Sequence, residues 1–308
     1  MNILCTPEFF DFEDFPTSWQ VVKNSHQRIL TETEILAMIE QYQPVGICAG
    51  VEPLTRTVLQ RAAGLKVISR YGAGLDSVDL KAAEELGINV FNTPDAPVVA
   101  VAEHTIGLML GLLRHIHVMD AAMRRHQWKP VQGNTLAGKT VGLLGCGRIG
   151  TYVAKLAEAF GCRVLGYDPY LTDHQGCALR PLPEVLAEAD ILSLHMPATR
   201  ENYHFIGPAQ LQQMKSSALL INTGRGKLLD SAALIEALTS GTLAGAALDV
   251  YEEEPYRGPA MDLPVERTLL TPHVASNTAE TRQQMEAETV ANLIKGLQSR
   301  RNDGVLTS

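Results

Sequence analysis

The chain has 308 residues, 45% of them hydrophobic, which is enough for two domains of ordinary size with their own cores. Its 26 basic and 34 acidic residues give a net charge of -8 with no basic run, so we expect no nucleic-acid partner. We also expect a cytoplasmic protein with no membrane partner, because neither a signal-peptide pattern nor an apolar run of membrane-spanning length is present in the sequence.

Cysteine and histidine spacing gives no sign of a metal site. The five cysteines are scattered without a Cys-x-x-Cys pair, so we expect reduced, mostly buried thiols rather than a disulfide framework. His115 and His117 lie two residues apart and would point to different faces of a helix, so we interpret them as helix-surface histidines. No metal is expected.

Short β-branched runs alternate with helical patterns in the first third of the chain. The predicted strands are 2–5, 45–49, 65–70 and 88–91, and the predicted helices are 33–42, 55–63 and 79–86. This alternation predicts a small parallel sheet with helices on it. The apolar segment 98–126 predicts one long helix, buried between two bodies.

A second alternating series follows the polar stretch at 132–134. Its predicted strands are 140–144, 163–167, 191–195, 218–222 and 244–250, and its predicted helices are 148–160 and 231–238, the latter capped by Asp230. A final helix at 279–297 has no sheet of its own, and we expect it to pack on the first domain. The sequence therefore predicts an α/β fold of two doubly wound parallel-sheet domains.

A glycine-rich turn, Gly145-Cys146-Gly147-Arg148-Ile149-Gly150, connects a predicted strand to a predicted helix. In a dinucleotide-binding turn the first glycine permits the tight bend, the second lets a pyrophosphate approach, and the third lets helix and strand pack closely. The backbone N–H groups of Arg148 and Ile149 would then face the phosphates at the positive end of the helix. Such triplets occur by chance, but this one has the required strand and helix on either side.

Asp168 follows the next predicted strand, where the dinucleotide fingerprint requires an acidic residue. A carboxylate there accepts hydrogen bonds from the ribose hydroxyls of NAD and repels the extra phosphate of NADP. The simpler alternative is a surface aspartate after a turn that binds nothing. The dinucleotide fingerprint, however, requires the full order of strand, turn, helix, strand and acid, and the sequence has that order. The sequence therefore predicts NAD as the cofactor.

Three polar residues stand at the ends of later strands of the same domain or just after them, namely Arg225, Glu254 and His273. Ligands of a doubly wound sheet bind at the carboxyl ends of its strands. Oxidising a hydroxyl by hydride loss needs a base near neutral pH, and a histidine beside a carboxylate is suited to that task. An arginine offers a forked donor to a carboxylate. Each residue alone also fits a duller role, as a surface arginine, a solvated acid or a packed histidine.

At these residues the sequence resembles the D-isomer-specific 2-hydroxyacid dehydrogenase family, most closely its phosphoglycerate dehydrogenase branch. The matching blocks are 70–79, the glycine turn, 195–197, 222–226, 249–255 and 271–275. The resemblance covers essentially the whole chain and implies a Rossmann NAD-binding domain, residues 96–276, inserted into a smaller flavodoxin-like substrate-binding domain. That smaller domain would comprise residues 1–95 and the C-terminal helix at 277–308. A homodimer and a small 2-hydroxy or 2-keto acid substrate are also implied.

The resemblance assigns roles to individual residues. It implies that Arg225 binds the substrate, that His273 exchanges the proton and that Glu254 pairs with His273. Further cofactor contacts are implied at Thr93, Met196, Pro197, Thr223 and Asp249, the last at the nicotinamide carboxamide. The Gly72-Ala73-Gly74 loop offers the N–H groups of Ala73 and Gly74 to the substrate carboxylate. Arg70 either meets a substrate phosphate or serves as a structural ion-pair partner.

Two departures from the family bear on the substrate. The sequence ends at Ser308 without the extra regulatory domain of many phosphoglycerate dehydrogenases, so we expect no serine feedback of that kind. Glu254 replaces the glutamine of the formate dehydrogenases, which argues against formate. Hydroxypyruvate, glyoxylate, 3-phosphoglycerate and larger keto acids stay open. The alternative function is an NAD-sensing, corepressor-like interaction protein with the same fold, which turnover would exclude.

Overall fold

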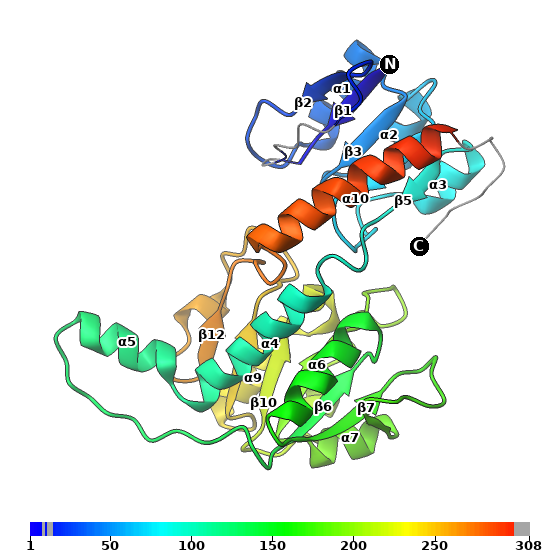
Figure 1. Ribbon diagram of the computed structural model, residues 1–308. Helices are drawn as coiled ribbons and strands as arrows, with labels where there is room; N and C mark the ends of the chain where they lie inside the picture. The colour runs from blue at the N-terminus through cyan, green and yellow to red at the C-terminus, as the bar shows by residue number, and fades with distance from the viewer. Residues whose placement is uncertain (8–9, 11–14, 299–308) are drawn as a thin grey trace. The chain divides into compact units, whose positions relative to one another are not determined.

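The computed structural model describes residues 1–7, 10 and 15–298 (Figure 1). The chain forms two compact units, the first comprising Met1–Pro97 with Asn277–Ser308 and the second Val98–Ser276. The predicted boundary between residues 95 and 96 lies two residues before this division, and the predicted boundary between 276 and 277 coincides with it.

The first unit contains a five-stranded parallel sheet in the order β2-β1-β3-β4-β5. The strands are β1 Asn2–Cys5, β2 Gln20–Lys23, β3 Gly46–Ala49, β4 Val67–Arg70 and β5 Asn89–Phe91. This is the strand order of flavodoxin-like sheets. The strand β2 was not predicted, because this four-residue edge strand has polar, exposed residues at both ends and no long apolar run.

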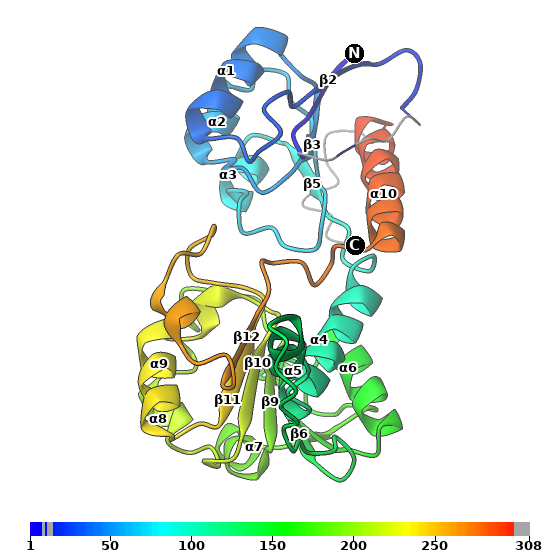
Figure 2. The ribbon, with the colours of Figure 1, turned by 90° about the vertical axis from the view of Figure 1, so that its left-hand side faces the viewer.

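Helices cover both faces of this first sheet (Figure 2). Three of them, α1 Glu32–Tyr42, α2 Arg56–Arg61 and α3 Leu80–Glu85, lie on one face, and α10 Ala279–Gln298 lies on the other. Val290 and Leu293 of α10 are buried in a cluster with Val67 and Phe91 of the sheet. The prediction that the last helix packs on the first domain is therefore confirmed.

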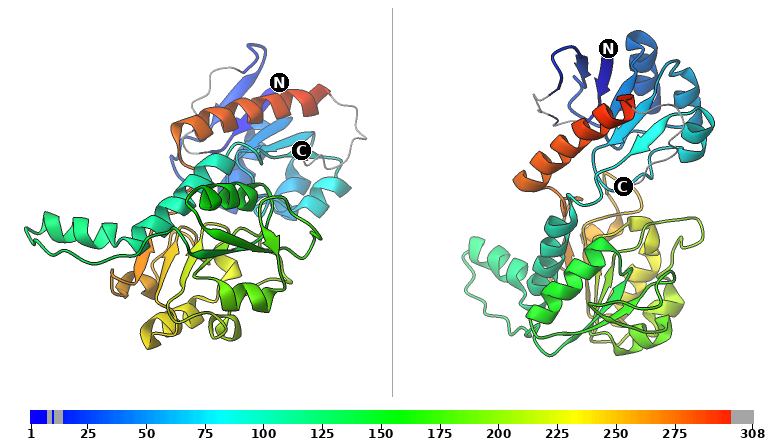
Figure 3. Two further views of the ribbon diagram at one scale, coloured as in Figure 1. Left: turned by 60° about the horizontal axis from the view of Figure 1, so that its bottom comes forward. Right: turned by 45° about the vertical axis from the view of Figure 1, so that its right-hand side comes forward.

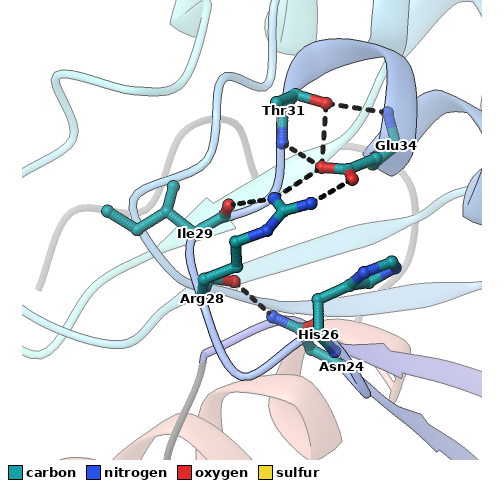
Figure 4. A network of polar contacts seen from close by, with 6 residues as sticks. All are labelled: Asn24, His26, Arg28, Ile29, Thr31 and Glu34. Carbon is teal, nitrogen blue, oxygen red and sulfur yellow. Dashed lines mark hydrogen bonds and ion pairs between the residues drawn. The ribbon is translucent and has the colours of Figure 1, made fainter.

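The start of α1 shows how local sequence sets an element boundary (Figure 4). The Thr31 hydroxyl accepts a hydrogen bond from the Glu34 N–H, and the Glu34 carboxylate accepts one from the Thr31 N–H at 2.8 Å. This reciprocal capping box satisfies two N–H groups that the first helical turn leaves unpaired. Arg28 also binds Glu34, and this hydrogen bond is the main reason why the pKa of Glu34 is lowered.

The second unit contains a seven-stranded parallel sheet in the order β12-β11-β10-β9-β6-β7-β8. The strands are β6 Thr140–Leu144, β7 Arg163–Tyr167, β8 Ala178–Leu179, β9 Ile191–Leu194, β10 Leu219–Asn222, β11 Gly245–Leu248 and β12 Thr268–Leu270. Chain order reverses between the neighbours β6 and β9, which makes this the switch point of a Rossmann sheet. The strands β8 and β12, which have only two and three residues, were not predicted.

The helices of the second unit form two layers, and each layer packs in its own hydrophobic cluster (Figure 2). The helices α7 Leu182–Glu188, α8 Pro208–Leu211 and α9 Ser231–Ser240 share one cluster, and α4 Val98–Leu113 and α6 Arg148–Ala159 share the other. Short 3-10 turns occur at Gly226–Leu228 and Pro259–Asp262. Asp230 caps α9 by accepting the Ala233 N–H at 3.0 Å, as predicted.

The single helix predicted at 98–126 is wrong. The chain breaks at His115, whose φ of 51° is left-handed, and continues as α5 Ile116–Arg124 at an angle of 67° to α4. The helix α4 packs against α6 within the second unit, and α5 extends away from the sheet (Figure 3). His117 is half-buried and contacts the Val265 carbonyl through Nε2 at 2.7 Å, so it is not a plain surface histidine.

Within the described residues, no single helix has the length and apolar character to cross a bilayer. The helices α4 and α5, which are bent at 67° to each other, reach that length and apolar character only when they are taken together. All five cysteines lie in the described part of the chain. They are free thiols, four of them buried and Cys162 partly exposed, which confirms the prediction of mostly buried thiols.

Candidate functional site

The residues predicted for the second unit gather at one edge of its sheet. All its strands are parallel, so their carboxyl ends meet at that edge. The glycine turn follows β6, Asp168 follows β7, Met196 follows β9, Arg225 follows β10 and the Asp249 segment follows β11. His273 follows β12. The site therefore spans the switch point at which a Rossmann sheet binds its ligands.

The glycine turn has the geometry that a dinucleotide requires. Gly145 has a φ of 95°, and a Cβ there would lie 2.7 Å from the carbonyl carbon of His195. A Cβ on Gly150 would lie 2.1 Å from the Gly145 carbonyl oxygen, whereas a Cβ on Gly147 would meet no described heavy atom within 4 Å. The helix α6 begins directly after Gly147, so the first-turn N–H groups face an open approach suited to a pyrophosphate.

Asp168 is tied to the glycine turn by its backbone contacts. Its Oδ2 accepts the Cys146 N–H at 2.9 Å, and its Oδ1 accepts the Tyr170 N–H at 3.0 Å. These two bonds fix the carboxylate beside the turn, where the ribose of a bound dinucleotide is expected. Together with the open space over Gly147, this placement fits an NAD molecule.

The loop that carries Arg225 is held by a residue to which the sequence analysis gave no role. The buried Asn222 donates from Nδ2 to the Arg225 carbonyl at 3.0 Å and accepts the Gly224 N–H at 3.1 Å. The Arg225 guanidinium donates from Nη1 to the Gly224 carbonyl at 2.7 Å. A Cβ on Gly226 would lie 1.9 Å from the carbonyl carbon of Tyr251, so this loop touches the segment that leads to Glu254.

His273 and Glu254 form the predicted pair. The His273 Nδ1 lies 2.7 Å from the Glu254 Oε2, and the side chains are 47% and 35% exposed. Burial acts to raise the pKa of Glu254, but the hydrogen bond and charge of His273, with the Tyr251 N–H, outweigh it and lower that pKa. Because the carboxylate is ionised, Nδ1 carries the proton of this bond, and Nε2 is the nitrogen that can exchange one.

The acidic run at 252–254 is not a uniform solvated face. Glu252 accepts from the Ser231 N–H at 3.2 Å and lies 2.9 Å from the Nε2 of His204. Glu253 is exposed, and Glu254 turns to His273. The three neighbouring acids therefore have three different environments, and Glu254 alone of them faces the candidate proton-exchanging histidine.

Asp249 holds the segment that carries His273. Its carboxylate is 0% exposed and accepts from the Thr271 hydroxyl at 2.6 Å and from the N–H groups of Val274 and Ala275, each at 2.9 Å. Its backbone carbonyl accepts the His273 N–H at 2.8 Å. These contacts make Asp249 the organiser of the 271–275 loop, and the predicted contact with the nicotinamide carboxamide stays a prediction.

His104 was missed by the sequence analysis, although the sequence held a signal for it. Its Nε2 lies 3.2 Å from the Thr271 Oγ1 and 3.6 Å from the Asp249 Oδ1. The neighbouring Thr105 places its hydroxyl 2.9 Å from that of Thr223. Residues 103–105, Glu-His-Thr, are the one polar run in the otherwise apolar α4. A polar run inside a buried helix indicates buried partners.

Replacing Asp249 with asparagine is expected to lower the free energy of unfolding by about 1–3 kcal/mol, because the loop N–H donors lose a charged acceptor. Burial acts to raise the pKa of Asp249, but hydrogen bonds from His104, Thr271 and the loop lower it overall. Its stabilisation is therefore complete above the unfolded pKa of about 3.9 and is lost as pH falls through the lower folded value. Urea unfolding should show that the variant's free energy of unfolding is lower than that of the wild type by a constant amount near neutral pH. This difference should shrink in acid, and a difference that grows in acid would contradict the prediction.

The predicted residues of the first unit form their own cluster after β4 and β5. Gly72 has a φ of 127°, and a Cβ there would lie 2.8 Å from Nη1 of Arg70. The fully buried Thr93 accepts the Gly72 N–H through Oγ1 at 2.9 Å, and Asn92 donates to the Ala73 carbonyl at 2.7 Å. Thr93 therefore holds the loop of Ala73 and Gly74, and its contact with a cofactor stays a prediction.

The other predicted cofactor contacts lie in the second unit. Met196 and Thr223 are nearly buried, whereas Pro197 and Arg148 are exposed and Ile149 is half-buried. Within the described residues, no group of three or more His, Cys, Asp or Glu side chains is arranged to hold a metal ion.

A Rossmann sheet with a glycine turn, an acid after the next strand and a histidine–carboxylate pair at the same edge is typical of a dinucleotide-binding α/β protein. Residues 106–275 match the family model described as D-isomer specific 2-hydroxyacid dehydrogenase, NAD binding domain. The chain belongs to this family. The resemblance inferred from the sequence is thereby confirmed.

Known proteins of the family are similar over most of the chain. A D-3-phosphoglycerate dehydrogenase of Methanocaldococcus jannaschii is 40% identical over 277 residues, 87% of this chain and 52% of that protein. A glyoxylate reductase of Thermofilum pendens is 40% identical over 80% of this chain and 76% of its own length. The crystal structure of a glyoxylate reductase from Paecilomyes thermophila superposes with a TM-score of 0.87 at 30% identity, covering 99% of this chain and 97% of its own. The chain spans about half the length of the phosphoglycerate dehydrogenase that it matches.

Proposed function

We propose that this protein transfers a hydride between NAD(H) and a small D-2-hydroxy acid or the corresponding 2-keto acid. The observation that carries the proposal is the 2.7 Å contact between His273 and Glu254 at the same sheet edge as the glycine turn and Asp168. Family membership supports the reaction class. Similarity to a phosphoglycerate dehydrogenase and to glyoxylate reductases supports a small acid as substrate.

His273 is the proposed acid and base. The hydride chemistry would be supplied by the nicotinamide of the bound cofactor. His273 accepts the hydroxyl proton at Nε2 during oxidation and returns it to the carbonyl oxygen during reduction. Glu254 keeps the proton on Nδ1 through its ionised carboxylate and stabilises the imidazolium that forms.

Arg225 is the proposed anchor for the substrate. Its guanidinium presents paired N–H donors to a carboxylate or keto oxygen, and the Asn222 side chain fixes the backbone on which it stands. We further propose that the N–H groups of Ala73 and Gly74 bind the substrate carboxylate. Contact of Arg70 with a substrate phosphate remains a prediction, as does the cytoplasmic location.

A turnover screen tests the proposed function. Purified protein is mixed with NADH and, in separate assays, glyoxylate, hydroxypyruvate, phosphohydroxypyruvate and a branched 2-keto acid, and NADH loss is followed by absorbance. Consumption of NADH with at least one acid is expected. Silence across the panel, together with measurable NADH binding, would favour the NAD-sensing alternative. A preference for the phosphorylated acid that disappears in Arg70→Met would assign the phosphate contact.

Replacing Asp168 with alanine is expected to raise the ratio of kcat/KM for NADPH over NADH by about tenfold or more, because the repulsion of the 2′-phosphate is removed. Asp168→Asn is the matched control, since its amide oxygen can still accept the Cys146 N–H while the charge is gone. Steady-state kinetics with both cofactors measure the change. An unchanged ratio in both variants would place the selectivity residue elsewhere.

We also propose that the protein is a homodimer that uses the region of α5. Large apolar side chains are exposed there, including Ile116, Met123 and the 85% exposed Trp128. Exposed apolar side chains that gather on one segment are characteristic of protein interfaces. Sedimentation equilibrium should give twice the chain mass, and Ile116→Asp with Met123→Asp should give monomers. A monomeric wild-type protein at micromolar concentration would contradict the proposal.

A further inference from the structure

Two thiols, one of them in the glycine turn itself, lie close together. The Sγ atoms of Cys146 and Cys177 lie 3.6 Å apart. Cys146 is the residue between Gly145 and Gly147, and Cys177 directly precedes β8. A Cβ on Gly166 of β7 would lie 2.6 Å from the Cys146 sulfur and 2.5 Å from the Cys177 sulfur. The absence of a side chain at Gly166 therefore creates the space in which both sulfurs sit.

A histidine, His174, is hydrogen-bonded to one thiol of this pair, that of Cys177. The Nδ1 of His174 lies 3.3 Å from the Cys177 Sγ and accepts the Gly176 N–H at 3.0 Å. The Thr151 hydroxyl donates to the Gly147 carbonyl at 2.8 Å, so its oxygen is left to accept from His174 Nε2 at 2.9 Å. Both contacts place the ring proton on Nε2. The Nδ1 is therefore an acceptor directed at the Cys177 thiol.

The two thiols are not equivalent. The hydrogen bond from the Cys146 thiol lowers the pKa of the Cys177 thiol, although burial acts in the opposite direction. The same hydrogen bond and burial raise the pKa of Cys146. Cys177 is also the one that contacts the His174 base and retains 9% exposure. Cys177 therefore ionises first, and a thiolate is the form of cysteine that reacts with oxidants.

The molecule provides an internal comparison. Cys5 and Cys48 are direct neighbours across the β1–β3 ladder, but both are buried in the first unit with 1% and 0% exposure. Burial raises the pKa of Cys48. Both of these neighbouring thiols lack the solvent contact on which oxidation depends, and among the described residues no histidine is hydrogen-bonded to either of them. Proximity of two sulfurs alone is thus insufficient, and the histidine distinguishes the Cys146–Cys177 pair.

We propose that Cys177 and Cys146 form a peroxide-sensitive pair that switches the cofactor site. His174 accepts the Cys177 proton, and the thiolate attacks one oxygen of hydrogen peroxide. The O–O bond breaks, Cys177 becomes a sulfenic acid, and the departing hydroxide takes up a proton as water. Cys146 then attacks the sulfenic sulfur, the S–O bond breaks, and a second water leaves with the Cys146 proton. In total, two thiols lose two electrons and two protons while one peroxide becomes two waters.

We infer that formation of the disulfide displaces Cys146 within the glycine turn. The sulfurs must close from 3.6 Å to about 2.05 Å, the length of an S–S bond. Cys146 stands between Gly145 and Gly147 and donates its N–H to Asp168, so its displacement disturbs the proposed pyrophosphate and ribose contacts together. The oxidised protein binds NADH more weakly, and reduction by a dithiol restores binding. This inference rests on the proposed cofactor site at the glycine turn.

Peptide mapping and NADH titration test the switch together. The full chain is treated with stoichiometric hydrogen peroxide, its remaining thiols are blocked, and half of the sample is then reduced. Trypsin places Cys146 in peptide 140–148, Cys162 in 156–163 and Cys177 in 164–200. A cross-link between 140–148 and 164–200 that dithiothreitol removes is expected. NADH fluorescence titration should show binding about tenfold weaker after oxidation and restored after reduction.

Three variants serve as controls. Cys177→Ser should bind NADH as the reduced wild type does, and peroxide should no longer change that affinity. Cys162→Ser should respond as the wild type does. His174→Gln should form the same cross-link at least several times more slowly, because the base for Cys177 is removed.

The outcomes separate the two proposals. Absence of the cross-link in peroxide-treated wild type, or a cross-link that leaves NADH affinity unchanged, would overturn the switch. Reduced wild type that fails to bind NADH would contradict the proposed cofactor site, while the peptide map would still decide the thiol chemistry. A loss of affinity in peroxide-treated Cys177→Ser equal to that of the wild type would also overturn the inference.

Discussion

Replacing His273 with asparagine is expected to lower kcat by about 10²- to 10⁴-fold, the usual contribution of a general acid or base. NADH affinity should stay within about twofold, because the proposed pyrophosphate and ribose contacts are at the glycine turn and Asp168. Asparagine can still donate a hydrogen bond toward Glu254, so the loop keeps its main contact while proton exchange is lost. Stopped-flow reduction of a keto acid, with a parallel NADH titration, measures both quantities.

His204 provides a matched control for this variant. Like His273, it has a φ of 53° and contacts a glutamate of the same loop, with Nε2 2.9 Å from Glu252. His204→Asn should therefore disturb a comparable histidine–glutamate pair without a large change in kcat. A similar loss of kcat in both variants would show that loop integrity, rather than proton exchange, limits the reaction. A large loss of NADH affinity in His273→Asn would remove His273 from the acid and base role.

Replacing Arg225 with lysine is expected to lower kcat/KM for the keto acid by about 10- to 100-fold, the value of one or two charge-assisted hydrogen bonds. Lysine keeps the positive charge but loses the forked donor that matches a carboxylate. The effect should appear in kcat/KM for the acid and leave KM for NADH nearly unchanged. The same substitution at Arg257, an exposed arginine of the 251–258 loop, serves as the control.

Equal sensitivity of the two arginine variants would contradict the assignment of Arg225 as the substrate anchor. A change confined to KM for NADH would instead place the guanidinium at the cofactor. The position of Arg225 after β10 does not by itself tell a substrate contact from a cofactor contact. The kinetic pattern distinguishes the two.

The elements that the sequence predicted well are those whose pattern is complete within a short window. The strands β6 and β7 agree with prediction to the residue, because their apolar runs are bounded by polar and glycine residues. The strands β2, β8 and β12 have two to four residues and depend on neighbouring strands for pairing, so no local run marks them. The break at His115 lies in a segment whose composition favours helix on both sides.

The site could be predicted where chemistry follows a motif and could not where it depends on tertiary contacts. The glycine turn and Asp168 have a fixed spacing, and the structure adds the hydrogen bond that joins them. The link between Asp249 and the 271–275 loop joins positions that are far apart in sequence, so spacing does not reveal it. The thiol pair of Cys146 and Cys177 is likewise separated by 31 positions and by a whole strand and helix.

The close approach at Gly226 fixes the spacing between two segments of the site. Because a Cβ there would lie 1.9 Å from the backbone of Tyr251, the Arg225 loop and the segment leading to Glu254 meet main chain to main chain. No side-chain length enters that spacing. Substitutions of other side chains in the site can therefore change its shape, whereas the main-chain contact keeps the proposed anchor Arg225 and the Glu254 segment at a fixed spacing. The spacing between these two segments is therefore set by the fold and not by the choice of side chains.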